Sequence, residues 1–118
     1  MYKDMSQADI YIYRGDHDEQ LVELVWDDDG QPYDLTDIAR ADLTATVGGK
    51  KVLNLSTTDR SITFLDRIKG QLLLNFTPAL TQQMTWRQAK YDLQLISKTK
   101  RVKTRLEGTL YLEHDITT

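Results

Sequence analysis

The residues of this chain that could do chemistry are few and lie far apart in the sequence. There are two histidines, His17 and His114, and no cysteine among the 118 residues. Neither histidine has a His, Cys or carboxylate partner at the spacing of a zinc site. The serines lie outside any nucleophile motif (Ser6, Ser56, Ser61 and Ser97). We therefore expect no catalytic residue, no metal site, no cofactor and no enzyme activity.

Carboxylates are the remaining candidates for acid–base or metal chemistry. A pair brought together by folding is an open alternative, but no acidic residue lies on an apolar strand face, where loss of water would adapt it to catalysis. Asp27, Asp28 and Asp29 precede Gly30 in a turn signal. They could hold calcium, yet the distal glutamate of a calcium-binding loop is absent. We interpret this segment as a turn.

A basic cluster follows the penultimate strand that we expect (Lys98, Lys100, Arg101, Lys103 and Arg105). A surface that reads nucleic acid would add aromatic stacking residues to such a cluster. The nearest aromatic residues, Tyr91 and Tyr111, lie away from the turn, and the net charge is −3. We expect a solvated hairpin turn and no nucleic-acid partner. Lys98, Lys100 and Arg101 are kept as candidate contacts to a partner protein.

The charge is divided unevenly along the chain. Residues 1–59 hold 13 acidic and 5 basic side chains, whereas residues 60–118 hold 5 acidic and 10 basic ones. If loops concentrate these charges at two ends, the acidic end of one copy would attract the basic end of the next. The alternative is two separate, solvated loop clusters.

Tyrosines give the one indication of a binding surface. Tyr11, Tyr13 and Tyr111 fall on the register opposite the aliphatic residues of their strands, so we expect some to be exposed. Exposed aromatic residues that cluster often mark a protein interface. They could also form a stacking platform for a carbohydrate. The Arg14-Gly15-Asp16 triplet spells an integrin-type motif, but three residues are too few to predict adhesion.

In the segments that must position these residues, apolar and polar residues alternate with a period of two, as in β-strands. Alternation predicts a long hairpin from Ala89 to Leu112, with its turn at Ser97 to Arg101. We expect six earlier strands (9–14, 19–26, 40–47, 51–55, 61–65 and 72–76). Thr77-Pro78 predicts a helical turn that reaches Met84, with Leu80 and Met84 on one face. Trp26, Trp86 and Tyr91 are expected core anchors.

About eight short strands and one helical turn before the penultimate strand favour an all-β antiparallel sandwich, with a barrel as the alternative. The length fits one domain. We expect a flexible arm at 1–8, the domain at 9–113 and a tail at 114–118. No apolar run is long enough to cross a bilayer, and the N-terminus lacks the apolar region of a signal peptide. We expect no membrane partner and synthesis in a reducing cytoplasm.

Several segments together resemble one family. They are Asp9-Ile10-Tyr11-Ile12-Tyr13-Arg14-Gly15-Asp16, Asp27-Asp28-Asp29-Gly30-Gln31-Pro32-Tyr33-Asp34-Leu35-Thr36, Gly70-Gln71-Leu72-Leu73-Leu74-Asn75-Phe76-Thr77-Pro78-Ala79, Ala89-Lys90-Tyr91-Asp92-Leu93-Gln94-Leu95 and Leu106-Glu107-Gly108-Thr109-Leu110. In order and spacing, over residues 9 to 113, they resemble small phage tail and baseplate proteins related to the N-terminal domain of the siphophage upper baseplate protein.

This resemblance implies an immunoglobulin-like β-sandwich that is a structural, non-enzymatic part of a virion tail. It implies contacts with other tail or baseplate proteins, a homo-oligomer, and no catalytic or cofactor residues. Larger members continue into coiled-coil or receptor-binding domains, whereas this sequence ends at Thr118. We therefore expect an assembly or adaptor module located in the virion tail.

Overall fold

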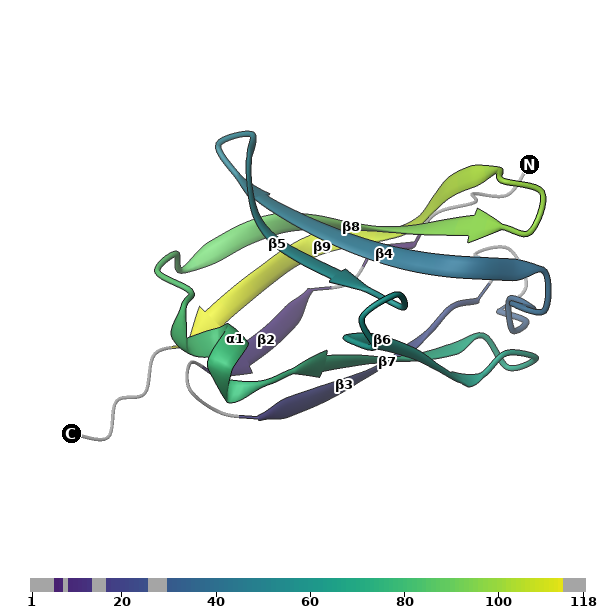
Figure 1. Ribbon diagram of the computed structural model, residues 1–118, viewed down its shortest axis with the longest axis horizontal. Helices are drawn as coiled ribbons and strands as arrows, with labels where there is room; N and C mark the ends of the chain where they lie inside the picture. Colours follow the sequence, from purple (N-terminus) through teal and green to yellow (C-terminus); the bar gives the residue numbers. More distant parts are fainter. Residues whose placement is uncertain (1–5, 8, 14–16, 26–29, 114–118) are drawn as a thin grey trace.

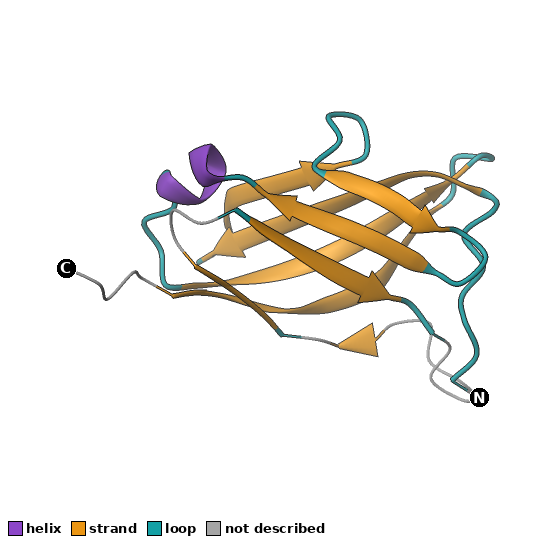
Figure 2. Ribbon diagram, turned by 90° about the horizontal axis from the view of Figure 1, so that it is seen from below, coloured by secondary structure: helices purple, strands orange, loops and turns teal. Residues whose placement is uncertain are grey.

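Two β-sheets packed face to face make up the computed structural model, which describes residues 6–7, 9–13, 17–25 and 30–113 (Figures 1 and 2). Its elements in chain order are β1 (Ser6–Gln7), β2 (Ile10–Tyr13), β3 (Asp18–Glu23), β4 (Ile38–Val47), β5 (Lys50–Ser56), β6 (Ile62–Asp66), β7 (Gln71–Phe76), α1 (Pro78–Gln82), β8 (Gln88–Ser97) and β9 (Val102–Glu113). The expected two-sheet sandwich is confirmed. In the described residues no helix is long and apolar enough to span a membrane.

The larger sheet has the order β1-β9-β8-β4-β5, and β2 also pairs with β9; the smaller sheet has the order β3-β7-β6. Most neighbouring strands are antiparallel. The exception is the pairing of β1 and β2 with β9, which is parallel and aligns Ile10 with Leu110 and Ile12 with Leu112. The first and last described strands therefore lie side by side in one sheet.

The long hairpin of β8 and β9 is confirmed and lies at the centre of the larger sheet. Leu93 opposes Leu106 and Ala89 opposes Leu110, and these residues are buried. A bulge follows Leu93, where the register shifts by one residue. The alternation that places Leu106 and Leu110 in the core therefore does not extend inward to the start of β9, and Val102 is exposed beside the turn.

At the tip of the β4–β5 hairpin, too, the alternation of apolar and polar residues does not lead to burial. Ala41, Leu43 and Ala45, which alternate with polar residues, are buried, but Val47, the next residue in the same alternation, is exposed. Figure 1 shows the tip of this hairpin curving away from the sheet of β3, β7 and β6. The inward-facing position of Val47 has no opposing layer there, so the alternation continues in sequence without burial.

The helical turn forms where the Thr77-Pro78 signal predicts it. The Thr77 hydroxyl accepts a hydrogen bond from the Leu80 amide at 3.2 Å, which satisfies one of the free amides at the helix start. Met84 is buried and Leu80 is partly buried against the core. The segment therefore covers one end of the sandwich (Figure 1).

The core lies between the sheets and consists mainly of leucine, with isoleucine and alanine next in number. Phe76, Leu74 and Leu43 are fully buried, and Tyr91 is buried as expected. Burial raises the pKa of the Tyr91 hydroxyl, and the nearby carboxylate of Asp9 adds to the effect. Trp86 packs against the core while partly exposed. The third expected anchor, Trp26, lies outside the described residues, as do the tail at 114–118 and most of the arm at 1–8.

Candidate interaction site

Two of the three candidate tyrosines form a stacked pair on the outer surface of the larger sheet. The rings of Tyr11 and Tyr111 have centroids 4.8 Å apart and an interplanar angle of 13°. The parallel pairing of β2 with β9 places these two residues opposite one another. Tyr11 is 55% exposed, and Tyr13, two positions further along the same face, is 54% exposed. We call these three residues the tyrosine face.

A groove borders the tyrosine face. It has a volume of about 460 Å³ and lies between Tyr111 and the tip of the β4–β5 hairpin at Gly48 and Gly49. Hydroxyl, amide and ammonium groups of Thr46, Gln88, Lys90 and Thr109 also line it. The stacked pair thus stands beside a polar hollow rather than on a flat sheet.

The three basic candidates lie at the other end of the β8–β9 hairpin. Tyr111 opposes Gln88 near the start of β8, whereas the turn that carries Lys98, Lys100 and Arg101 follows the end of β8. Lys100 has φ +69°, the left-handed backbone that closes the turn. The structure therefore divides the six candidates into the tyrosine face and a separate basic turn, residues 97–101.

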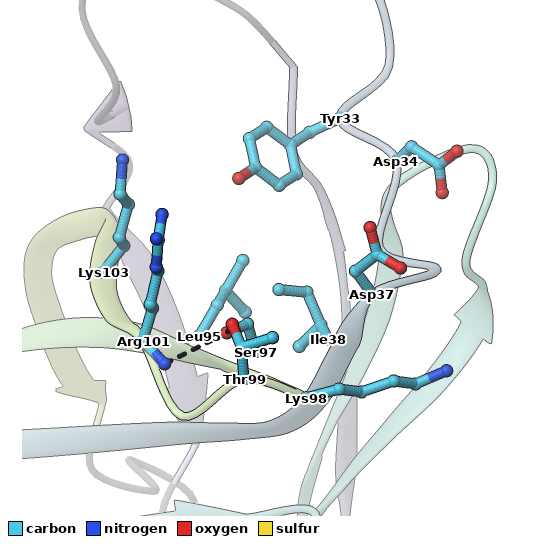
Figure 3. A pocket seen from close by; sticks show the side chains of 10 residues that line it. All are labelled: Tyr33, Asp34, Asp37, Ile38, Leu95, Ser97, Lys98, Thr99, Arg101 and Lys103. Atoms are coloured by element: carbon cyan, nitrogen blue, oxygen red, sulfur yellow. Dashed lines mark hydrogen bonds between the residues drawn. The ribbon is translucent and has the colours of Figure 1, made fainter.

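The basic turn borders a pocket of about 450 Å³, which we call the end pocket (Figure 3). Arg101 and Lys103 extend along one side, and Asp37 lies across from them. The side chains of Ile38 and Leu95, both buried, lie between these two sides. The pocket therefore combines a cationic wall, a carboxylate and an apolar floor.

This arrangement places described acidic and basic residues at the same end of the sandwich. Asp34 and Asp37 line the end pocket together with Lys98 and Arg101. The described residues therefore do not separate the charge into an acidic and a basic pole. The aspartates at 27–29, on which the idea of complementary ends partly depended, lie outside the described residues.

Main-chain and side-chain hydrogen bonds fix the loop before β4 that carries Asp37. The Lys98 amide donates to the Asp37 carbonyl oxygen at 2.9 Å, which joins this loop to the basic turn. The Arg67 guanidinium donates from Nη1 to the carbonyl oxygens of Leu35, at 3.1 Å, and Ile38, at 2.7 Å. It also lies 3.9 Å from the centre of the Phe64 ring. These contacts fix the position of the loop before β4 relative to the basic turn, and both segments line the end pocket.

Two aspartates have carboxyl pKa values that are lowered by local hydrogen bonds. Asp34 accepts from the hydroxyl and the amide of Thr36, and these bonds hold the pKa of Asp34 below its usual value. Asp59 accepts from the hydroxyl and the amide of Ser61, with the same effect on its pKa. Both carboxylates act as turn caps.

The histidines and the other side chains that could take part in catalysis or metal binding form no reactive arrangement in the described part of the chain. His17 Nε2 lies 2.8 Å from Asn75 Oδ1 at an exposed position. No group of three His, Cys, Asp or Glu side chains among the described residues could hold a metal ion. His114, the Arg14–Asp16 triplet and the aspartates at 27–29 lie outside these residues.

Sequence reasoning missed residues whose roles depend on distant contacts. The Asp9 carboxylate accepts a hydrogen bond from the Thr109 amide at 3.0 Å and joins the start of β2 to β9. Arg67 stands in a turn, where an exposed charge is the ordinary expectation. Tyr33 and Asp37 lie outside every strand that the sequence predicted. Their approach to residues 95–103 leaves no signal in local periodicity.

Solved structures with a similar backbone include a chicken TCR, with 8% identity and a TM-score of 0.54, and murine CRIg, with 9% identity and a TM-score of 0.42. The matches cover 99% and 98% of this chain, and 57% and 95% of the other chains. This chain has an immunoglobulin-like fold. Because the match covers 57% of the chicken TCR chain, this chain spans a little over half the length of that chain. No family model and no curated protein matches the sequence.

The immunoglobulin-like fold is held here without disulfides, since the chain has no cysteine. Apolar packing between the sheets replaces such a link, with Val22 and Leu72 from the smaller sheet and Leu93 from the larger sheet in one core cluster. The fold itself does not specify an activity, because this architecture carries many unrelated functions. The tyrosine face and the end pocket are the surface features that bear on the function of this chain.

Proposed function

We propose that this chain is a non-enzymatic structural module of a bacteriophage tail or baseplate that assembles through protein–protein contacts. The observation that carries the proposal is the stacking of the exposed Tyr11 on the partly buried Tyr111 at the outer surface of the larger sheet. Tyrosine supplies a large contact area at little cost in conformational entropy and is enriched in interfaces. The phage assignment is supported by the order of sequence segments that resembles tail and baseplate proteins.

The tyrosine face fits contact with a second copy or with another tail protein. Tyr11 and Tyr13 expose about half of their surface, and the polar groups of Lys90 and Thr109 lie nearby. An apolar centre with a polar surround is the usual anatomy of a specific interface. We expect burial of the tyrosine rings to supply most of the binding free energy.

Light scattering at low and high salt tests the mode of assembly. We expect an oligomer whose mass is nearly independent of salt, because apolar contacts are not screened. Tyr11→Ser should shift it toward monomer. Leu65→Ser is the matched control, because Leu65 is 58% exposed but lies on the smaller sheet. A monomer at all concentrations that also fails to bind any tail protein would contradict the proposal.

The location in a virion needs its own experiment. Mass spectrometry of purified phage particles from the source bacterium should detect this chain at a constant ratio to other tail proteins. Its presence in the cell lysate together with its absence from purified particles would refute a structural role in the virion.

A carbohydrate-binding module is the alternative, and the groove beside Tyr111 favours it. Sugar rings stack on aromatic faces while their hydroxyls bond to polar groups such as those of Gln88 and Thr109. Titration with neutral oligosaccharides should then perturb the amide signals of residues 88–90 and 109–111. Unchanged spectra would remove this alternative.

A further inference from the structure

Two opposite charges face each other across the end pocket without pairing. Arg101 extends along one wall, and Asp37 lies across from it, with the side chains of Ile38 and Leu95 between them (Figure 3). Among the described residues neither Arg101 nor Asp37 forms an ion pair or a side-chain hydrogen bond. The guanidinium and the carboxylate are therefore both available to a ligand.

The other charged side chains that line the pocket are engaged or directed elsewhere. Lys103, on the same wall as Arg101, has an interaction partner of its own. The carboxylate of Asp34 accepts hydrogen bonds within its own turn. Lys98 points away from Arg101 (Figure 3). Arg101 and Asp37 are thus the charged groups that face each other across the interior of the pocket and remain open to a ligand.

We infer that the end pocket binds a zwitterion in which a short aliphatic chain separates an ammonium from a carboxylate, the chemistry of an ω-amino acid or of a C-terminal lysine. The carboxylate pairs with Arg101, because a planar guanidinium can hold it through two parallel hydrogen bonds. The ammonium donates to Asp37. The aliphatic chain packs on Ile38 and Leu95, beside the partly buried ring of Tyr33. This inference does not depend on the proposed structural function.

The separation of the two charges selects this class over simpler ligands. Arg101 and Asp37 are too far apart to form an ion pair, and buried apolar side chains lie between them. An α-amino acid carries its two charged groups on a single carbon atom, so it cannot lay an aliphatic segment on the floor while it pairs with both walls. A ligand with a single charge leaves one wall without a partner. A pocket of about 450 Å³ is within the range of small-molecule sites.

The backbone holds the two charged residues in position before a ligand arrives. The Ser97 amide donates to the Arg101 carbonyl oxygen at 2.9 Å, and the Arg101 amide donates to Ser97 Oγ at 3.0 Å, so the backbone of Arg101 is fixed. The Lys98 amide donates to the Asp37 carbonyl oxygen at 2.9 Å, which sets the opposite wall relative to the basic turn. A preformed site lowers the entropy that binding must offset.

The test is a titration of the ¹⁵N-labelled full chain with 6-aminohexanoate, monitored by NMR. We expect this zwitterion to perturb the amide signals of residues 33–38 and 97–103. Hexanoate and hexylamine each carry one of its two charges on a similar aliphatic chain. Both should bind about tenfold more weakly, as expected for loss of a charge-assisted hydrogen bond. Glycine should also bind more weakly than 6-aminohexanoate.

Two variants assign each charge of the ligand to its wall. Arg101→Gln should lower the affinity for 6-aminohexanoate to that for hexylamine, and Asp37→Asn should lower it to that for hexanoate. Lys100→Gln is the matched control, because it removes a charge from the same turn at a residue that does not line the pocket. It should change the affinity less than twofold. Amide signals outside the two segments should match those of the native chain, which shows that each variant is folded.

A short peptide that ends in lysine distinguishes the two sources of the ligand. Binding tighter than that of 6-aminohexanoate supports the inference with a chain end as the source, and weaker binding supports it with a free zwitterion. The same peptide with an amidated C-terminus lacks the carboxylate and should bind no better than hexylamine. No perturbation by 6-aminohexanoate, equal binding of hexanoate, hexylamine or glycine, or affinity unchanged by Arg101→Gln would overturn the inference. Tyr11→Ser should leave the titration unaltered, which separates this site from the tyrosine face.

Discussion

The backbone of Gly70 lies directly against that of Tyr33, so that a Cβ atom at position 70 would stand 2.6 Å from the Tyr33 carbonyl oxygen. The same Cβ would stand 2.6 Å from the Leu24 carbonyl oxygen. Leu24 donates its amide to the Gly70 carbonyl oxygen, and Tyr33 donates its own to Leu24. The turn between β6 and β7 therefore supports the loop that carries one side of the end pocket.

Replacement of Gly70 should destabilise the protein more than replacement of another glycine with positive φ. Gly70→Ala meets two backbone oxygens and adds strain at φ +68°, so we expect a loss of more than about 2 kcal/mol in the free energy of unfolding. Gly49→Ala is the control, because its φ is +84° but its surroundings are open. It should cost about 1 kcal/mol in urea denaturation. Equal losses for the two variants would contradict the close packing at Gly70.

Arg67 should be irreplaceable by lysine. A lysine keeps the charge but cannot reproduce the planar guanidinium that bonds to the Leu35 and Ile38 carbonyl oxygens and covers the Phe64 ring. We expect Arg67→Lys to cost about 1–2 kcal/mol in stability and to speed hydrogen exchange at the Leu35 amide. Arg87→Lys, at an exposed position, should be neutral. Unchanged exchange in Arg67→Lys would refute this role.

The stacked tyrosines should be energetically coupled in the monomer. A double-mutant cycle with Tyr11→Ala and Tyr111→Ala, measured by thermal unfolding under dilute conditions, should give a coupling free energy of about 0.5–1 kcal/mol. Tyr11→Ala combined with Leu65→Ala is the control pair, since these residues lie on different sheets. The effects of the control pair should add. Additivity in both pairs would show that the stacking contributes nothing to stability.

Acid should weaken the fold in part through Asp59. The hydrogen bonds from Ser61 lower the pKa of Asp59 in the folded state below the usual 3.8, so the unfolded chain binds a proton there more readily. The stabilisation is complete above the usual pKa and is lost as the pH falls through the lowered one. Asp59→Asn does not titrate, so the melting temperature of the native chain should exceed that of the variant most at pH 6. A difference that stayed constant down to pH 2 would contradict this linkage.

Local patterns in the sequence predicted the elements whose stability depends on near neighbours. The hairpin at 89–112 alternates with a period of two, and Thr77-Pro78 is a self-contained signal for a helix start. The tyrosines at 11 and 111 could be assigned to the outer face because each stands opposite aliphatic neighbours in its strand. The stacking of the two rings could not be predicted, because it depends on a parallel pairing between segments from the two ends of the chain.

The end pocket was missed for a related reason. Lys98 and Arg101 were recognised as a basic turn, but Asp37 and Ile38 belong to another segment, and only folding brings the two together. Val47 and Val102 show the opposite error, since their place in the alternation predicts burial and both are exposed. Val47 lies past the edge of the opposing layer, whereas the bulge after Leu93 shifts the register at Val102. A period of two reports which way a side chain points and not whether anything covers it.

The parallel pairing of β2 with β9 also decides how the domain would bear mechanical load. In a parallel pair the start of one strand lies beside the start of the other, so Ile10 and Leu112 are near opposite ends of the pair. A pull applied toward the N-terminal side of β2 and the C-terminal side of β9 runs along both strands. It loads their hydrogen bonds together in shear, whereas pulling apart the adjacent ends of an antiparallel hairpin breaks them one by one. The domain is built to resist tension along its own chain.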